Sequence, residues 1–217
     1  KLRKELPELF RLAEFIRGKK PRGISAPKPP NSDPNGDQYV YDFIGMLGLP
    51  LVPTADVNTD VHAAFLPYQT LTDPQLPQKI TQITDRGIPL LITNHLAEEL
   101  DNVDKSQEVE VLDIPQNRWN LMEIPEDRLK AIRKKMLEPL NVEFNAPPRT
   151  ALYLFGDNLA AIENFNDKEI EARFGMEPYR KGKVVLAIPE KEIELKQAGE
   201  SIALSIPARS MVLLRME

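Results

Sequence analysis

The chain has 217 residues, 41% hydrophobic and 28% charged, which is typical of a folded globular protein with one large domain or two modest ones. Its 28 basic and 33 acidic residues give a formal net charge of −5, which argues against a nucleic-acid binder or a protein held on anionic lipid. No apolar run approaches the roughly 18 residues of a membrane span, and the absence of cysteine excludes disulfides, thiolate metal sites and cysteine nucleophiles. We therefore expect no nucleic acid, membrane or cofactor as a partner. The compartment stays open, although our expectation inclines to a bacterial, exported or periplasmic protein.

The first predicted element is an amphipathic helix from Leu2 to Ile16. Its apolar residues recur every three or four positions, and Gly18, followed by two lysines and a proline, supplies a stop. Two interpretations are open: a terminal helix that docks on its own domain, and a connector from a domain upstream. Because the chain starts without methionine and without an apolar targeting segment, we expect a fragment in which residues 1–20 are a connector.

Residues 21–145 are expected to form a doubly wound α/β domain. Short apolar runs alternate with helical stretches, and the runs lack the polar alternation of a half-exposed strand, which is typical of parallel strands covered on both faces. The predicted strands are Ile24 to Pro27, Leu49 to Val52, Ala63 to Leu66, Ile88 to Thr93 and Glu108 to Ile114, and the predicted helices are Asp37 to Leu47, Leu76 to Gly87 and Glu126 to Leu140.

Residues 146–217 are expected to form a small antiparallel β-sandwich. Of the 20 prolines, 17 lie in residues 1–150, and because proline interrupts strand ladders, its near absence afterwards favours uninterrupted strands. Asn145 to Arg149 is interpreted as a linker, and beyond it the hydrophobic period changes to two. The seven predicted strands are Ala151 to Phe155, Leu159 to Phe165, Ile170 to Phe174, Lys183 to Ile188, Ile193 to Lys196, Ser201 to Ile206 and Met211 to Arg215.

Motifs for dinucleotide, phosphate, serine-hydrolase and zinc-protease chemistry are absent from the sequence. The two histidines, His62 and His95, are 33 positions apart and have no third ligand nearby, so we expect no metal site. Acidic neighbours are interpreted as solvated faces rather than acid and base pairs: Glu98, Glu99, Asp101 and Asp104 form one group, and Asp56 and Asp60 the other.

Two further features carry alternatives. Trp119, beside Arg118, suits stacking on a sugar ring, but an indole that plugs the space between two domains is the favoured interpretation. The string Glu163 to Asp167 resembles a site, yet it falls at a predicted hairpin turn, where Asn and Asp satisfy the backbone.

Three stretches, Tyr41 to Val52, Ala63 to Pro67 and Gly87 to Asn94, resemble the amidotransferase-like middle domain of trimeric bacterial β-galactosidases of glycoside hydrolase family 42. In that family a catalytic (β/α)₈ barrel precedes this domain and a small β-sandwich follows it. Asn164 to Asp167 and Ile206 to Ser210 are similar to such closing sandwiches. The resemblance covers the order of elements over nearly the whole chain.

The same resemblance implies that the amidotransferase nucleophile is missing. Laid on Gly87 to Leu96, the cysteine of the parent pattern falls on Asn94, and the glycine that follows it falls on Leu96. An amide cannot be activated as a thiol can, so that route to glutamine hydrolysis is closed. A crevice at the carboxyl ends of the strands would remain, lined by Tyr68, Gln69, Asn94 and His95. These four side chains are either ligand contacts or buried hydrogen-bonding groups.

No catalytic residue can be carried over from the family, because the chain is too short to contain the barrel as well, which needs roughly 200 residues or more. We expect a non-catalytic accessory or assembly region of a glycoside-hydrolase-like protein acting on carbohydrate. Its partner would be an upstream catalytic barrel domain or further copies of the chain. Two alternatives remain: a free-standing carbohydrate- or small-ligand-binding protein, and an enzyme with chemistry at His95 and nearby carboxylates.

Overall fold

A computed structural model describes residues 2–101, 103 and 106–217. The chain divides into two compact units. The α/β unit contains residues 23–44 and 51–140, and the sandwich unit contains the residues up to Arg22 together with residues 45–50 and 141–217.

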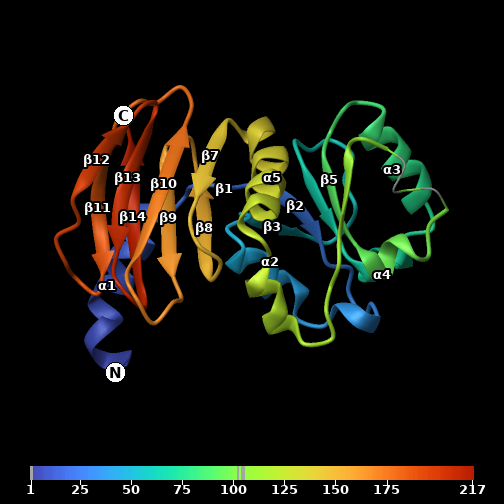
Figure 1. Ribbon diagram of the computed structural model, residues 1–217, viewed down its shortest axis with the longest axis horizontal. Helices are drawn as coiled ribbons and strands as arrows, with labels where there is room; N and C mark the ends of the chain where they lie inside the picture. The colour runs from blue at the N-terminus through green and yellow to red at the C-terminus, as the bar shows by residue number, and fades with distance from the viewer. Residues whose placement is uncertain (1, 102, 104–105) are drawn as a thin grey trace. The chain divides into compact units, whose positions relative to one another are not determined.

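The α/β unit is built on a five-stranded sheet in the order β3-β2-β4-β5-β6, and all its neighbouring strands are parallel (Figure 1). The chain runs from β2 outward to β3 and then returns to the other side of β2 to form β4, so the strand order reverses between β2 and β4. Open α/β sheets bind ligands beside the carboxyl ends of the strands at such a reversal. The strands are β2 (Ile24–Pro27), β3 (Leu51–Thr54), β4 (Ala64–Leu66), β5 (Leu90–Thr93) and β6 (Val109–Leu112).

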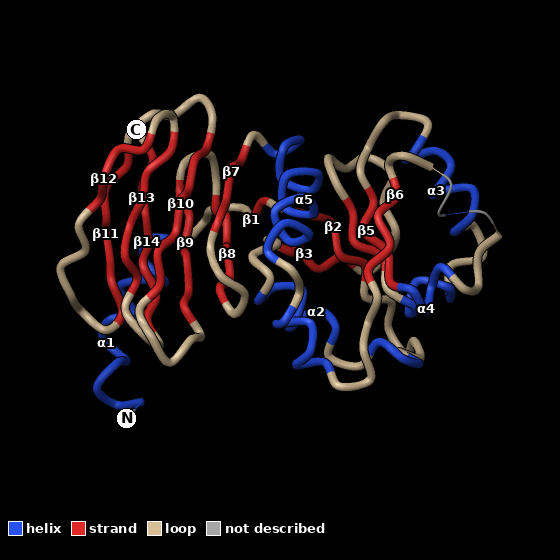
Figure 2. The backbone as a smooth tube through the Cα atoms, viewed as in Figure 1, coloured by secondary structure: helices blue, strands red, loops and turns tan. Residues whose placement is uncertain are grey.

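Helices cover both faces of this sheet (Figures 1 and 2). On one face α3 (Leu76–Thr84) and α4 (Asn94–Ala97) pack into a single core cluster with residues of β4 and β5. On the other face lie α2 (Val40–Met46) and α5 (Glu126–Leu137), and the Tyr41 ring of α2 packs edge-on against Phe65 of β4, with centroids 5.8 Å apart. The 3₁₀ turns are η1 (Asn35–Asp37), η2 (Tyr68–Thr72), η4 (Arg118–Glu123) and η5 (Glu138–Leu140).

The sandwich unit has two antiparallel sheets, ordered β1-β8-β9-β14-β11 and β12-β13-β10-β7 (Figure 2). Buried and exposed residues alternate along β7 and the first part of β10, as expected of strands with one face turned to a core. The strands are β1 (Pro21–Arg22), β7 (Val142–Asn145), β8 (Thr150–Phe155), β9 (Leu159–Asn164), β10 (Ile170–Met176), β11 (Gly182–Ile188), β12 (Leu195–Ala198), β13 (Ser201–Ile206) and β14 (Ser210–Met216). An α/β unit with a wound parallel sheet and a β-sandwich are both present, so the predicted fold class is confirmed.

Several predicted boundaries were wrong. Residues 142–145 are not the end of the α/β region followed by a linker: they form β7, which pairs with β10 of the sandwich. Pro21–Arg22 likewise pairs with β8. In β7 buried and exposed residues alternate over only four positions, a signal that the neighbouring prolines obscured. The helix predicted at Asp37 starts at Val40, because Asp37 ends a separate 3₁₀ turn, and the helix predicted to reach Leu140 ends at Leu137.

The first helix, α1 (Leu2–Ile16), has the predicted bounds. Its Leu12 and Phe15 pack against a cluster formed by Ala161, Leu186 and Leu213 of the sandwich. A role for α1 as a join to an upstream domain stays a prediction. In the described part of the chain, no helix has the length and apolar character needed to cross a bilayer.

Candidate functional site

One buried carboxylate organises the carboxyl-end edge of the parallel sheet. Asp37, at the end of η1, has no solvent exposure. Its Oδ2 accepts hydrogen bonds from the backbone N–H of Tyr68 and from the hydroxyl of Thr93, both at 2.7 Å, and its Oδ1 lies 2.7 Å from Nδ1 of His95. Buried charge is stable only when it is well paired, and three partners meet that requirement. Asp37 therefore joins the segments that follow β2, β4 and β5.

The turn from β5 into α4 places two of these partners. Thr93 ends β5 and is the N-cap of α4, where its Oγ1 accepts the backbone N–H of Leu96 at 3.3 Å. The same hydroxyl donates to Asp37, so Thr93 links the helix cap to the buried carboxylate. His95 lies in the first turn of α4, and its side chain is 23% exposed. The local cap thus fixes the orientation of the imidazole.

The His95 ring rests on Gly36. A Cβ at Gly36 would lie 2.4 Å from ring atoms Cε1 and Nε2, so only glycine fits beneath the ring in its present position. The Gly36 carbonyl is held from outside by the Arg118 guanidinium, which also hydrogen-bonds the carbonyl of Pro115. Arg118 Nε donates to the carbonyl of Gln38 at 3.3 Å. The Asp37 turn is therefore held by Arg118 on its far side.

A phenol belongs to the same neighbourhood. The Tyr41 hydroxyl donates to the carbonyl of Pro27 at 2.5 Å. Burial raises the pKa of this phenol well above its ordinary value, and the negative charge of Asp37 raises it further. Tyr41 is therefore a neutral hydrogen-bond donor at physiological pH.

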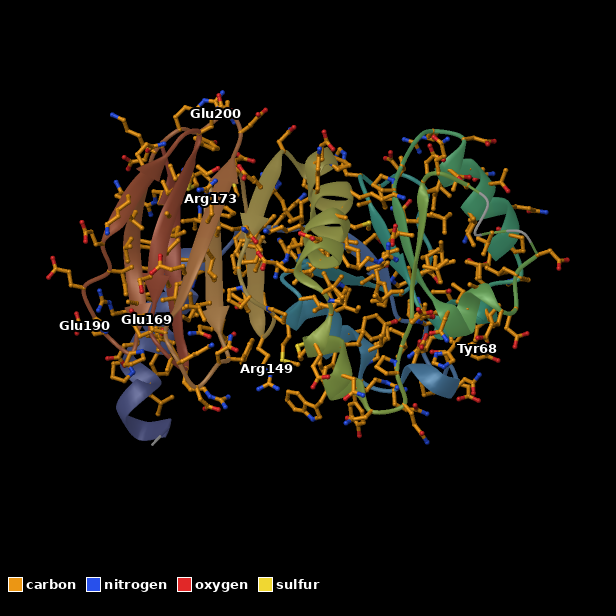
Figure 3. The ribbon with its side chains drawn as sticks, viewed as in Figure 1. Tyr68, Arg149, Glu169, Arg173, Glu190 and Glu200 are labelled. Carbon is orange, nitrogen blue, oxygen red and sulfur yellow. The ribbon has the colours of Figure 1, made fainter. Side chains whose placement is uncertain are left out.

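The four predicted crevice residues have different surroundings. Tyr68 and His95 both meet Asp37, Tyr68 through its backbone and His95 through its ring. Figure 3 shows Tyr68 beside α4, against which η2 packs. Asn94 is a structural link, because its Oδ1 accepts the backbone N–H of Ile114 at 2.8 Å. Gln69 is 6% exposed, and its Oε1 has no hydrogen-bond partner among the described residues.

The other candidates from the sequence lie elsewhere. His62 is exposed in the loop before β4, whereas His95 is engaged by Asp37. Within residues 2–101, 103 and 106–217, no group of three His, Asp or Glu side chains is arranged to hold a metal ion, and Asp104 of the acidic group lies outside the described residues. Trp119 is 53% exposed, and its ring packs edge-on against Phe43 with centroids 5.1 Å apart, while its interpretation as a plug between two domains stays a prediction.

The Asn164 motif of the sandwich is structural, as its hairpin position indicated. Asn164 is 1% exposed, and its Nδ2 donates to the carbonyls of Lys168, Ile206 and Pro207 at 2.9, 3.1 and 2.8 Å. Its Oδ1 accepts from the backbone N–H and from Nδ2 of Asn166 at 2.8 and 3.0 Å. The two stretches likened to closing sandwiches, residues 164–167 and 206–210, thus meet in one hydrogen-bonded corner.

Sequence reasoning missed the residue at the centre of the site. Asp37 was interpreted as the first residue of a helix after a turn-rich segment, where Asp is common for local reasons. Thr93 carried a usable signal, because a Thr between a buried strand and a short helical stretch is a typical N-cap. The distance between Asp37 and His95, 58 positions in the chain, leaves no short-range pattern to detect.

Chemically, the arrangement is a buried carboxylate that orients an imidazole. With Asp37 ionised and Nδ1 of His95 as the donor, Nε2 carries the lone pair of a neutral imidazole. In the described part of the chain, Nε2 has no hydrogen-bond partner. This nitrogen is therefore suited to accept a proton or a hydrogen bond from a bound molecule.

The sequence matches no protein-family model and no curated protein. Solved structures match in fold. α-L-Fucosidase isoenzyme 2 from Paenibacillus thiaminolyticus is similar with a TM-score of 0.52 and 10% identity, over 97% of this chain and 51% of that one. Two further matches have lower TM-scores. The exo-carrageenase GH42 from Bacteroides ovatus has a TM-score of 0.32 at 10% identity, over 82% of this chain and 26% of that one. The α-amylase from H. orenii has a TM-score of 0.29 at 11% identity, over 83% of this chain and 58% of that one.

This chain spans about half the length of the fucosidase. At 10% identity the similarity is one of fold alone. The fold of this chain is therefore one that also occurs within that fucosidase.

Proposed function

We propose that this chain is a non-catalytic accessory or assembly region of a larger glycoside-hydrolase-like protein acting on carbohydrate. Its α/β unit is amidotransferase-like and lacks the cysteine nucleophile. The partner is an upstream catalytic barrel domain, further copies of the chain, or both. The sandwich closes the region at its C-terminal end.

One observation carries this proposal. At the turn between β5 and α4, where the amidotransferase pattern requires a thiol, the chain has Asn94, whose amide oxygen accepts the backbone N–H of Ile114. An amide is not a nucleophile, and this one links the end of β5 to the segment after β6. The position is therefore used for structure. The fold match over 97% of this chain but only 51% of a fucosidase is what an accessory region of a longer enzyme would give.

The test compares this chain with a longer polypeptide that joins it to a catalytic barrel. Both are assayed on a panel of aryl β-galactosides and aryl α-fucosides. We expect no turnover by the 217-residue chain, and turnover only when a barrel is attached. Turnover by the chain alone that disappears in His95→Ala, with thermal unfolding unchanged, would replace the proposal with an enzyme working at His95.

A second candidate, a free-standing protein that binds a small ligand at the sheet edge, is favoured by two polar atoms. Nε2 of His95 and Oε1 of Gln69 have no hydrogen-bond partner within the described residues, and Gln69 is 6% exposed. A buried atom such as Oε1 of Gln69 is costly unless something satisfies it. Calorimetry against a panel of glycans and small organic acids tests this candidate, with His95→Ala as the variant. Micromolar binding that the variant loses would favour the binding protein over the accessory region.

A further inference from the structure

Two aromatic side chains of the α/β unit are exposed. Tyr39 is 75% exposed and Trp119 is 53% exposed. Phe43, which is buried, contacts the Trp119 ring edge-on, and its backbone N–H donates to the Tyr39 carbonyl at 3.4 Å. Phe43 therefore contacts both segments, through its ring at Trp119 and through its backbone at Tyr39.

The backbone beneath both rings is held in place. Arg118, the residue before Trp119, donates from Nε to the carbonyl of Gln38, the residue before Tyr39, at 3.3 Å. Tyr39 itself has φ of 61°, a left-handed conformation that a bulky aromatic residue rarely adopts. Such outliers cluster at functional sites, where the surrounding contacts maintain them. The backbone that carries the two rings is thus fixed before any ligand binds, which lowers the entropic cost of binding.

The surroundings of the rings suit a sugar better than a protein. A stable protein interface needs about 800 Å² on each side with an apolar centre. In the described part of the α/β unit, Tyr39 and Trp119 are the large hydrophobic residues that are exposed. Their neighbours in the chain are exposed planar polar groups instead: Gln38, Asp42, Asn117 and Asn120. A pyranose offers an apolar C–H face for a ring and hydroxyl groups for amides and carboxylates.

We propose that Tyr39 and Trp119 form a carbohydrate-binding platform, in which the aromatic rings stack on sugar rings and the surrounding amides and Asp42 bind hydroxyl groups. The choice of carbohydrate as the ligand rests on the proposed function. The exposure of the two rings is independent of that function. The platform is distinct from the His95 site, which the rings do not help to build.

Trp119 is the single tryptophan of the chain, so intrinsic fluorescence excited above the tyrosine band reports on this platform alone. Lactose, cellobiose, xylobiose and L-fucose are titrated separately into the intact chain. We expect at least one of them to change the intensity or wavelength of the emission with a Kd of about 1 mM, a typical value for a shallow site with few contacts.

Three variants sharpen the test. Tyr39→Asn removes the ring while keeping a residue that tolerates the left-handed conformation, and it is expected to weaken binding about tenfold. Tyr39→Phe keeps a ring and should bind within about threefold of the native chain. Tyr153→Ala removes a 38%-exposed ring from the sandwich unit and should leave the titration unchanged.

Two outcomes would overturn the platform. One is no spectral change with any of the four sugars at about 50 mM, far above the expected Kd. The other is self-association in sedimentation that Tyr39→Asn abolishes, since that would make the rings a protein interface. Neither outcome alters the expected inactivity of the chain on aryl glycosides, so failure of the platform is distinguishable from failure of the accessory proposal.

Discussion

Each unit holds a chain reversal in place with one buried polar side chain, and the two networks end differently. In the sandwich, Asn164 is satisfied by three carbonyls and by the backbone and side chain of Asn166. In the α/β unit, Asp37 is satisfied by Tyr68, Thr93 and His95. Among the described residues, the Asn164 network closes on groups that have no further chemistry, whereas the Asp37 network ends on an imidazole with an unused nitrogen.

This difference separates a structural corner from a candidate site. Both side chains are fully or almost fully buried, so burial alone does not distinguish them. What distinguishes them is the last member of each network. A carbonyl can only accept, but an imidazole whose Nδ1 is fixed by a carboxylate presents Nε2 as a base or a hydrogen-bond acceptor. Removing each network in turn tests this distinction.

The largest effect is expected from Asp37→Ala. The substitution leaves the buried Thr93 hydroxyl and the Tyr68 N–H without an acceptor, and such losses in buried charged networks cost about 3 to 5 kcal/mol of the free energy of unfolding. Urea unfolding followed by Trp119 fluorescence measures it, because the only tryptophan lies in this unit.

His95→Ala is the matched control for Asp37→Ala. It removes one of three partners of the carboxylate and leaves the other two, so its cost should be about 1 to 2 kcal/mol. Equal losses for the two variants would show that Asp37 serves only to hold the imidazole. Asp37 would then not be the residue that joins the three segments.

Asn164→Ala is expected to cost about 2 to 4 kcal/mol, because it leaves the Asn166 N–H and several carbonyls unsatisfied in a buried corner. Hydrogen exchange should show the loss of protection in β9 and β13 rather than in β5. Asn164→Asp should be worse than Asn164→Ala, since a carboxylate would face three carbonyl oxygens. A milder aspartate variant would contradict the assigned direction of these hydrogen bonds.

Much of the fold follows from local pattern. Helical spacing of apolar residues located α1 at Leu2–Ile16, and a short extended run located β2 at Ile24–Pro27, both with their observed bounds. Both signals are local: a helix repeats its apolar residues every three or four positions, and a strand covered on both faces, such as β2, is buried at every position. β7 was missed because Val142–Asn145 is short, follows a helix directly and precedes two prolines. Its place in the sheet is fixed by pairing with β10, a contact between segments about thirty residues apart that no local pattern encodes.

The candidate site was predictable only in part. Tyr68 and His95 follow strands whose carboxyl ends share an edge, and that topology placed them near each other. Asp37 lies beyond the turn after β2, so its side chain could equally have faced solvent. Its burial depends on Gly36 allowing the ring of His95 to approach and on Arg118 holding the loop, two tertiary contacts with no sequence signature.

Gly36→Ala tests the approach of the ring directly. The backbone at Gly36 is outside the left-handed region, so alanine is tolerated there, but its Cβ would lie 2.4 Å from the His95 ring and displace it. We expect a loss of about 1 to 2 kcal/mol and the loss of the hydrogen-bonded Nδ1 proton signal in imidazole NMR spectra. At Gly45, in α2, a Cβ would meet no other atom within 4 Å, so Gly45→Ala should be neutral or stabilising. A retained Nδ1 signal in Gly36→Ala would show that the ring adapts without leaving Asp37.

The smallest effect concerns a carboxylate in the sandwich unit that lacks the support given to Asp37. Burial raises the pKa of Glu163, although the Tyr153 hydroxyl, 3.1 Å from its Oε2, partly opposes the shift. The folded chain therefore binds this proton more tightly than the unfolded chain does. The free energy of unfolding falls as the pH rises from the pKa of Glu163 in the unfolded chain, about 4.3, to its pKa in the folded chain. The loss is complete above the pKa of the folded chain.

Glu163→Gln removes this titration, so the variant should unfold at a higher temperature than the native chain at pH 7, and the difference should shrink below about pH 4. Glu126→Gln is expected to change stability in the opposite direction, because the Lys130 ammonium, 2.6 Å away, lowers the pKa of Glu126. That variant should be slightly less stable than the native chain at pH 7, with the difference fading on acidification. Identical pH profiles for the two variants would show that burial at Glu163 is not what sets its protonation.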